Sequence, residues 1–238
     1  MRLVQLIAIA TAFMAAAWII YAVVPTYTMK LWQLARSFCH RSDGRTLYLT
    51  FDDGPSPAYT SELLDLLKEL NIAATFFVVG AFAADNPALI KRMRDEGHAI
   101  GLHSYAHQNG LFLGPRATCA DLAKSQKVLA AQGVSARWCR PPWGHFNVAM
   151  IMCIARRGFK PFLWDVMAQD WSASSSVSAI EEKLKRRVRD GAIICLHDGR
   201  GSNHAPARTI AALRSTLPYL QSEGYRFETA ERYNNHGH

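Results

Sequence analysis

The chain has 238 residues, half of them hydrophobic, and a formal net charge of +8 at pH 7. This length and apolar content are enough to bury the core of one large α/β domain, and the sequence has no fixed-period repeat that would indicate an array of small units. The basic residues are scattered, and the densest run, "EEKLKRRVRD" at 181–190, places its acidic residues first, as suits a solvated helix. We therefore expect no nucleic-acid partner.

An apolar run at residues 3–24 has about the length that spans a bilayer. A cleaved signal peptide has a shorter apolar core and a sharper small-residue cleavage site, so we expect residues 1–24 to be an uncleaved transmembrane signal anchor. Residues 25–44 would then form a juxtamembrane linker, residues 45–230 the catalytic domain and residues 231–238 a tail.

The orientation of this anchor is indicated by the charges that flank it. Lys30, Arg36 and Arg41 follow the apolar run, whereas Arg2 and the terminal amine precede it. By the positive-inside rule, this count leaves a cytoplasmic position open for the residues that follow the span.

The five cysteines are odd in number and include no C-x-x-C pair; they are Cys39, Cys119, Cys139, Cys153 and Cys195. We expect neither a disulfide framework nor a zinc ribbon from this pattern. Most of these residues are expected to be small, buried and apolar in character, and they do not settle the redox compartment.

From residue 45 onward, short β-rich runs alternate with amphipathic helical segments. The expected strands are 46–51, 75–79, 98–102, 136–139, 161–164, 192–196 and 225–228. Among the helices, "SELLDLLKEL" at 61–70 has an apolar face at helical spacing, and "PALIKRMRDEG" at 87–97 begins with proline and ends with glycine. The alternation predicts an α/β fold of parallel βαβ units, namely a distorted, incomplete (β/α)7 barrel, with a doubly wound open sheet as the alternative.

Polar residues whose side chains could take part in catalysis or metal binding follow the ends of these expected strands. They are Asp52 and Asp53 after the first, His103 after the third, Arg140 after the fourth, Asp170 shortly after the fifth and His197 after the sixth. In parallel α/β folds, chemistry gathers at the C-terminal ends of the strands. The pattern therefore predicts one site.

The stretch "HSYAH" places His103 and His107 four residues apart, which on a helical turn puts both imidazoles on one face. The spacing alone is a weak signal, and Ser104 stands where H-E-x-x-H metalloproteases have their glutamate. One carboxylate of the Asp52–Asp53 pair would complete a facial triad for a divalent cation. The cation would also relieve the repulsion between the two carboxylates, and the second carboxylate would be free to act as a general base.

Three further residues fit the same site, although each could instead be structural. Arg140, in "CRPPWGHFN", could hold a carboxylate by a bidentate contact or lie on the surface of a Pro-Pro turn. Asp170, in "WDVMAQDW", is the expected partner of Arg140. His197, in "IICLHDG", is placed to act as a general acid.

The motifs TFDDGP, H-S-x-x-H, R-P-P-W-G, D-W and L-H-D, in this order, resemble those of the polysaccharide deacetylases with a NodB homology domain, carbohydrate esterase family 4. The resemblance covers roughly residues 45–230. It implies a distorted (β/α) barrel and metal-dependent hydrolysis of an N-acetyl group on an amino sugar.

The resemblance also implies a role for each matching residue. One divalent metal ion, most often zinc, with cobalt, nickel or manganese as other options, would be bound by Asp53, His103 and His107. Asp52 would be the general base and would be held by Arg140, which Asp170 would orient. His197 would protonate the leaving amine, with its proton stabilised by an acidic group that the sequence leaves open, Asp198 being adjacent.

The same resemblance implies which residues surround the acyl group. The backbone N–H of Trp143 would bind the oxyanion, and Trp171 would line the pocket for the acetyl methyl. Leu196 and Cys195 are expected beside the substrate. Cys195 stands where the family usually has an aliphatic residue, which predicts a slightly roomier acyl pocket.

We therefore expect a single-pass membrane enzyme that removes N-acetyl groups from a cell-envelope polysaccharide such as peptidoglycan, chitin-like oligomers or an exopolysaccharide, with an extracytoplasmic catalytic domain. One alternative is a deformylase or deacetylase of a lipid-linked sugar at the cytoplasmic membrane face, which the basic residues after the span favour. Another is a non-catalytic glycan-binding domain, which the intact set of site residues argues against.

Overall fold

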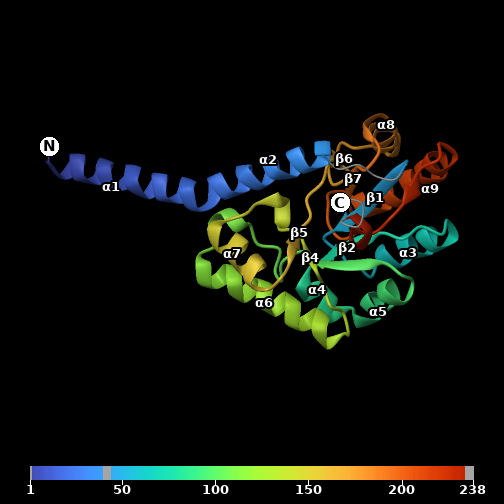
Figure 1. Ribbon diagram of the computed structural model, residues 1–238, viewed down its shortest axis with the longest axis horizontal. Coiled ribbons are helices and arrows are strands. Elements are labelled where there is room, and N and C mark those ends of the chain that lie inside the picture. The colour runs from blue at the N-terminus through green and yellow to red at the C-terminus, as the bar shows by residue number, and fades with distance from the viewer. Residues whose placement is uncertain (1, 40–43, 234–238) are drawn as a thin grey trace.

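The computed structural model describes residues 2–39 and 44–233 (Figure 1). It opens with a long helix made of α1 (Arg2–Trp18), a π-helical segment (Ile19–Val23) and α2 (Val24–Cys39). Figure 1 shows α1 projecting away from an α/β domain, whereas α2 lies against that domain. The helical stretch Arg2–Ser37 is long and apolar enough to cross a membrane.

The residues expected to form a linker after the span are helical as far as Cys39. The remainder of that linker up to residue 43, including Arg41, lies outside the described residues, as do residues 234–238 of the expected tail.

One curled sheet of parallel strands forms the centre of the domain. Within the described residues its eight strands are β1 (Thr46–Asp52), β2 (Thr75–Val78), β3 (Ala99–Leu102), β4 (Trp138–Cys139), β5 (Lys160–Pro161), β6 (Val166–Met167), β7 (Ile193–His197) and β8 (Arg226–Phe227). The strand order is β5-β4-β3-β2-β1-β7-β6, and β8 pairs with the start of β1. Because β5 and β6 lie at opposite ends of this order, the barrel is open between them, and the expected incomplete barrel is confirmed.

Strand β1 is central, and all seven of its residues are buried. It pairs in parallel with β2 on one side and β7 on the other, so both of its faces and both of its edges are covered. In this register, Asp52 at the end of β1 lies opposite His197 at the end of β7. The register therefore brings two of the expected site residues to the same end of the sheet.

Helices connect and cover the strands (Figure 1). They are α3 (Thr60–Glu69), α4 (Gly80–Asp85), α5 (Pro87–Asp95), α6 (Pro115–Ala131), α7 (Val148–Arg156), α8 (Val177–Arg187), α9 (Ala205–Ser222) and α10 (Ala230–Tyr233), with 3-10 turns at Gly110–Phe112 and Pro142–Gly144. The leucines of α3 at 63, 64, 66 and 67 are buried, as the apolar spacing predicts. Helix α5 starts at Pro87, as its sequence also predicts.

The sequence pattern is least informative between β4 and β7. A strand is expected at 161–164, but the structure has the two-residue strand β5 and a separate strand β6, which the pattern does not predict. Strands of two residues show no alternation of apolar and polar side chains, so their position depends on pairing with β4 and β7.

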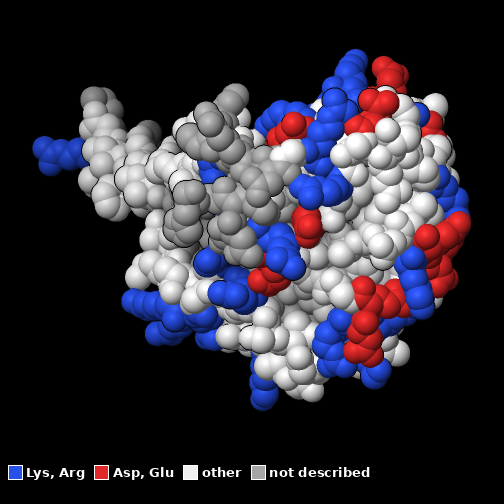
Figure 2. All heavy atoms as spheres, turned by 45° about the vertical axis from the view of Figure 1, so that its right-hand side comes forward, with Lys and Arg blue, Asp and Glu red and all other residues white. Residues whose placement is uncertain are grey.

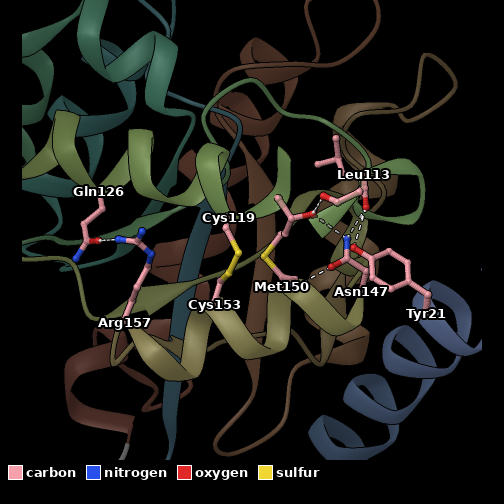
Figure 3. The surroundings of a disulfide bond; sticks show 10 residues. Tyr21, Leu113, Cys119, Gln126, Asn147, Met150, Cys153 and Arg157 are labelled. Carbon is pink, nitrogen blue, oxygen red and sulfur yellow. Dashed lines mark hydrogen bonds between the residues drawn. A yellow bond between two sulfur atoms is a disulfide. The ribbon is translucent and has the colours of Figure 1, made fainter. Parts of the chain in front are cut away.

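The cysteine pattern predicts no disulfide framework, but one pair of cysteines is bonded. Cys119 of α6 is bonded to Cys153 of α7, with 5.9 Å between their Cα atoms. Figure 3 shows this bridge joining the two helices, with the hydrogen bond between Arg157 and Gln126 on one side of it. Helix packing brings together residues that are 34 positions apart, so no local sequence motif predicts the bond. Cys139 and Cys195 are free and buried, as expected.

Acidic and basic side chains lie next to one another over much of the face seen in Figure 2. Arg92 of α5, for example, contacts Asp65 at 2.6 Å and Glu96 at 2.8 Å. This interspersed arrangement of exposed charges corresponds to the scattered pattern in the sequence.

The disulfide gives a prediction about stability. A bridge that closes a loop of this length restricts the unfolded chain and contributes about 3–4 kcal/mol on the loop-entropy model. We expect a reducing agent to lower the free energy of unfolding of the full chain in detergent by about that amount, as measured by denaturant titration. The matched control is the Cys119→Ala, Cys153→Ala double variant, on which the reducing agent should have no effect. An equal effect of the reducing agent on both proteins would contradict the assignment.

Candidate active site and metal centre

A cavity of about 460 Å3 lies where β1, β3 and β7 end. The side chains that line it include most of the expected site residues; the full set is Asp52, Asp53, His103, His107, Trp143, His145, Trp164, Met167, Trp171, Cys195, His197, Arg200 and Gly201. Residues that are distant in sequence therefore meet at one end of the sheet, as the positions of the polar residues predict.

Three of these side chains converge on one point. The Nε2 atoms of His103 and His107 lie 3.2 Å and 2.8 Å from Oδ1 of Asp53. The sequence spacing suggested a helical turn, but the two histidines lie in a loop in which Ser104 and His107 have φ values of 69° and 53°. Left-handed backbone at these two residues, rather than helical periodicity, turns both imidazoles toward the carboxylate.

The three residues fit a divalent cation. Their ligand atoms all lie within 4.8 Å of one another, and among the described residues the buried Oδ1 of Asp53 accepts no hydrogen bond of normal geometry, although the two imidazole nitrogens lie beside it. Burial would raise the pKa of Asp53, but the two adjacent imidazoles outweigh it and hold that pKa well below its usual value. One ionised carboxylate and two imidazoles form a ligand set of the facial type, which leaves coordination positions for water and substrate.

Asp52 lies beside this group and has a different partner. Its Oδ1 accepts a hydrogen bond of 2.7 Å from Nη1 of Arg140, whose side chain is fully buried. The same guanidinium donates to Oγ1 of Thr50 and to the carbonyl oxygens of Phe162 and Leu163. The expected contact between Arg140 and Asp52 is therefore present, but as one hydrogen bond rather than a bidentate contact, because the other donors of Arg140 are directed to Thr50, Phe162 and Leu163.

The expected contact between Asp170 and Arg140 is absent from the hydrogen bonds of the described residues. Asp170 instead pairs with His197: its Oδ1 lies 3.0 Å from Nδ1 of the imidazole, and its Oδ2 accepts a bond of 2.8 Å from the His197 backbone N–H. The reason is topological, because Asp170 follows β6, which pairs with β7, the strand that ends at His197. Asp170 is thus the acidic partner that the sequence could not identify.

This pairing fixes the protonation of His197. Burial would lower the pKa of this imidazole, but the charge and hydrogen bond of Asp170, aided by Asp52 and Asp53, raise it to about 9. A histidine with this pKa is cationic at neutral pH and can donate a proton into the cavity.

Asp198, adjacent to His197, points away from it. It accepts a hydrogen bond of 2.5 Å from Oγ1 of Thr60, and burial raises its pKa to about 7. Its carboxylate packs against Gly54, where a Cβ atom would come within 2.3 Å of Oδ2. Gly199 is similarly close to the backbone of Asp53, because a Cβ atom there would lie 1.8 Å from the Asp53 carbonyl oxygen. Glycine at both positions therefore allows the two motifs to approach each other.

Two tryptophans and one cysteine line the cavity as expected. Trp143 has a φ of 56° and packs edge-on against His107, and Trp171 packs edge-on against His197. The Cys195 thiol lies 3.5 Å from Oδ2 of Asp52. Leu196 does not line the cavity: it is fully buried in the hydrophobic core, because neighbouring residues of a strand point to opposite faces.

A second group of possible ligands, Asp52, Cys195 and His197, is less suited to a cation. Burial, with the nearby charge of Asp52, raises the pKa of the Cys195 thiol well above its usual value, so the thiol stays protonated. The Arg140 guanidinium already neutralises Asp52, and His197 is itself cationic. The charges therefore favour the group formed by Asp53 and the two histidines.

Sequence reasoning missed several lining residues: Trp164, Met167, His145, Arg200 and Gly201. His145 lies within "CRPPWGHFN", and Trp164 and Met167 lie within "WDVMAQDW", so each lies in a stretch of sequence that was already of interest. Arg200 and Gly201 follow the L-H-D motif, and their position depends on the loop conformation after β7.

Comparison with known proteins identifies the family. The profile described as Polysaccharide deacetylase matches residues 40–162. A chitooligosaccharide deacetylase of Sinorhizobium fredii (strain NBRC 101917 / NGR234) is 36% identical over 189 residues, covering 76% of this chain and 87% of the relative. A peptidoglycan-N-acetylglucosamine deacetylase of Bacillus cereus (strain ATCC 14579) is 34% identical over 187 residues, covering 78% and 86%.

A solved structure agrees with this assignment. The family 4 acetyl xylan esterase of Clostridium thermocellum, in complex with a cobalt ion, matches with a TM-score of 0.73 and 30% identity, covering 80% of this chain and 91% of that one. The metal ion in that structure agrees with the Asp–His group found in this cavity, which could hold a metal ion. The chain therefore belongs to the polysaccharide deacetylase family, and it is a hydrolase of the carbohydrate N-deacetylase type.

Proposed function

We propose that this enzyme removes N-acetyl groups from N-acetylglucosamine units of a cell-envelope polysaccharide, such as peptidoglycan, chitin-like oligomers or an exopolysaccharide. The observation that carries the proposal is the division of roles in one cavity. Asp53 faces two imidazoles, Asp52 is held by Arg140, and His197 is cationic. The substrates in the names of the two bacterial relatives support an N-acetylglucosamine unit.

One divalent metal ion, preferentially zinc, would be held by Asp53, His103 and His107. When bound, such an ion polarises an acyl oxygen and lowers the pKa of a water molecule. Zinc binds nitrogen and oxygen ligands of this kind, and a catalytic site retains an open position beside three protein ligands.

The side chains around the ion would move the protons. Asp52 accepts a proton from the attacking water, and the hydrogen bond from Arg140 fixes the orientation of its carboxylate. His197, oriented by Asp170, donates a proton to the nitrogen as the C–N bond breaks. Water is thereby divided between the two products, so that acetate and a free amine leave the site.

The remaining residues would position the acyl group. The backbone N–H of Trp143 would donate to the developing oxyanion. Trp171, Cys195 and Met167 line the cavity and would form the apolar wall for the acetyl methyl.

The membrane and its orientation belong to the same proposal. We assign α1 as a membrane anchor and the catalytic domain to the outer side of the membrane. The supporting observation is the bond between Cys119 and Cys153, because disulfides persist in oxidising compartments and are rare in the cytosol. The second candidate, a deformylase or deacetylase of a lipid-linked sugar at the cytoplasmic face, is favoured by Lys30 and Arg36 after the span.

The substrate class can be tested directly. The full chain in detergent should release acetate from acetylated chito-oligomers and from peptidoglycan, lose this activity to a chelator and regain it with zinc. Acetate is measured by an enzymatic assay. The proposal fails if the metal-restored enzyme releases acetate from neither substrate.

Replacing Asp52 should differ in effect from replacing one of the histidine ligands. We expect Asp52→Asn to lower kcat by about 10²–10⁴-fold, the usual contribution of general base catalysis, while zinc content is retained. His107→Ala should lose the zinc itself, as measured by elemental analysis after dialysis. The matched control is Asp65→Asn, an exposed carboxylate of α3 that should change neither quantity. Near-normal turnover by Asp52→Asn would show that the base is another residue.

The pairing of Asp170 with His197 predicts a change in pH dependence. The acid must be protonated, so activity falls as pH rises through the pKa of His197, which Asp170 raises. Asp170→Asn removes the negative charge and lowers that pKa. The alkaline limb of kcat/KM should therefore shift to lower pH, as measured by a full pH profile. A variant with reduced activity and an unshifted alkaline limb would contradict this role.

A further inference from the structure

The long N-terminal helix is attached to a loop near the active site. The Trp18 Nε1–H donates a hydrogen bond of 2.9 Å to the carbonyl oxygen of Leu111, and the Tyr21 hydroxyl donates one of 3.0 Å to that of Leu113. The rings of Trp18 and Phe112 stack with their centroids 6.4 Å apart. These contacts fix residues 110–113, here called the helix-contact loop, to the side of the helix.

The contacts lie where the helix leaves the domain. Helix α1 (Arg2–Trp18) has no buried residue, whereas Ala22 in the following π-helical segment is fully buried. At 1.5 Å per residue, α1 is about 25 Å long, close to the thickness of the hydrocarbon core of a bilayer. An inserted α1 would therefore bring Trp18 to the boundary between hydrocarbon and water, where tryptophan and tyrosine concentrate in membrane proteins.

Phe112 shares that position. Its side chain is 76% exposed, among the most exposed large apolar side chains of the described residues, and it is held beside Trp18 rather than folded into the core. An aromatic ring fixed at this depth would pass from water into the headgroup region of the bilayer, which removes apolar area from water.

The loop is also tied to the rim of the catalytic cavity. Oδ1 of Asn109 lies 3.0 Å from Nδ1 of His145, which lines the cavity, and Nδ2 of Asn147 donates to the carbonyl oxygen of Gly110 at 2.7 Å. Thr26 of α2 exchanges two hydrogen bonds with the backbone of Phe146. Figure 3 shows Tyr21 reaching from the helix toward Leu113 and Asn147. The helix, the loop and the cavity rim therefore form one connected unit.

We propose that Trp18 and Phe112, with the helix-contact loop, form a surface that contacts the lipid bilayer and holds the catalytic cavity close to the headgroups. The proposal rests on the membrane anchor proposed above, and it names the bilayer as the partner because the surface is continuous with the spanning helix. The enzyme would then act on glycan that lies at the membrane surface rather than on distant strands.

Depth-dependent fluorescence quenching tests this contact without relying on activity. The full chain carrying Cys39→Ser, in which Cys139 and Cys195 are buried, receives Phe112→Cys and an environment-sensitive thiol label, and is reconstituted in phosphatidylcholine–phosphatidylglycerol vesicles. The matched control is Ser222→Cys, at an exposed residue that ends α9, a helix that Figure 1 shows on the side of the domain away from α1. A third label at Ala8→Cys reports insertion of α1.

Lipids with a nitroxide near the headgroup should quench the label at position 112 several-fold more than the label at position 222. Equal quenching at both positions, with Ala8→Cys quenched by a deep nitroxide, overturns the proposal. Protection from aqueous iodide without nitroxide quenching also overturns it, because a second copy of the chain or another protein then covers the surface. Absence of quenching at position 8 refutes both the membrane anchor and this contact. Acetate release from soluble oligomers shows separately whether the proposed deacetylase chemistry holds.

A functional readout uses the same residue. Phe112→Asp should leave turnover of soluble chito-oligomers unchanged, because Phe112 does not line the cavity. Its turnover of the same oligomer attached to a phospholipid in vesicles should fall several-fold, whereas Phe112→Trp should retain it. Equal turnover of the vesicle-bound oligomer by wild type and Phe112→Asp would contradict the proposal.

Discussion

The buried ion pair between Arg140 and Asp52 is the interaction on which the rest of this site depends. Arg140 is the largest fully buried side chain among the described residues, and it joins the central strand β1 to the segment that crosses from β5 to β6, where the barrel is open. Removing one partner of such a pair costs about 3–5 kcal/mol, because the other charge remains buried and unpaired. The same contact orients the Asp52 carboxylate, which would act as the base. One ion pair therefore both stabilises the fold and positions a proposed catalytic group.

The parallel register around β1 explains how two adjacent carboxylates acquire different environments. Asp52 lies within the strand and faces Arg140 and Cys195, whereas Asp53, with a φ of 73°, already belongs to the turn and faces His103 and His107. On the other side of Asp52, β7 places His197 opposite it in register. One cavity thus contains the proposed base, Asp52, the ligand group around Asp53, and the cationic acid, His197. Each of these groups has a different partner that balances its charge.

The position of a site residue could be predicted from the sequence where the residue lies in a recognisable local motif. Contacts that depend on the pairing of short strands could not be predicted. Asp52, Asp53, His103, His107 and His197 follow the ends of strands that have recognisable patterns, so their convergence follows from parallel topology. The sequence pattern predicts the wrong partner for Asp170, because the strand that precedes it, β6, has only two residues and is located by pairing with β7. The bond between Cys119 and Cys153 and the contact of Trp18 with the helix-contact loop depend on helix packing between distant segments, which no spacing in the sequence encodes.

X-ray absorption at the zinc edge of the loaded full chain distinguishes most directly between the two possible ligand groups. With Asp53, His103 and His107 as ligands, the first shell contains nitrogen and oxygen at about 2.0–2.2 Å and no sulfur. A sulfur scatterer at about 2.3 Å would place the metal at Cys195 with Asp52 and His197, and would contradict the division of roles between the two aspartates.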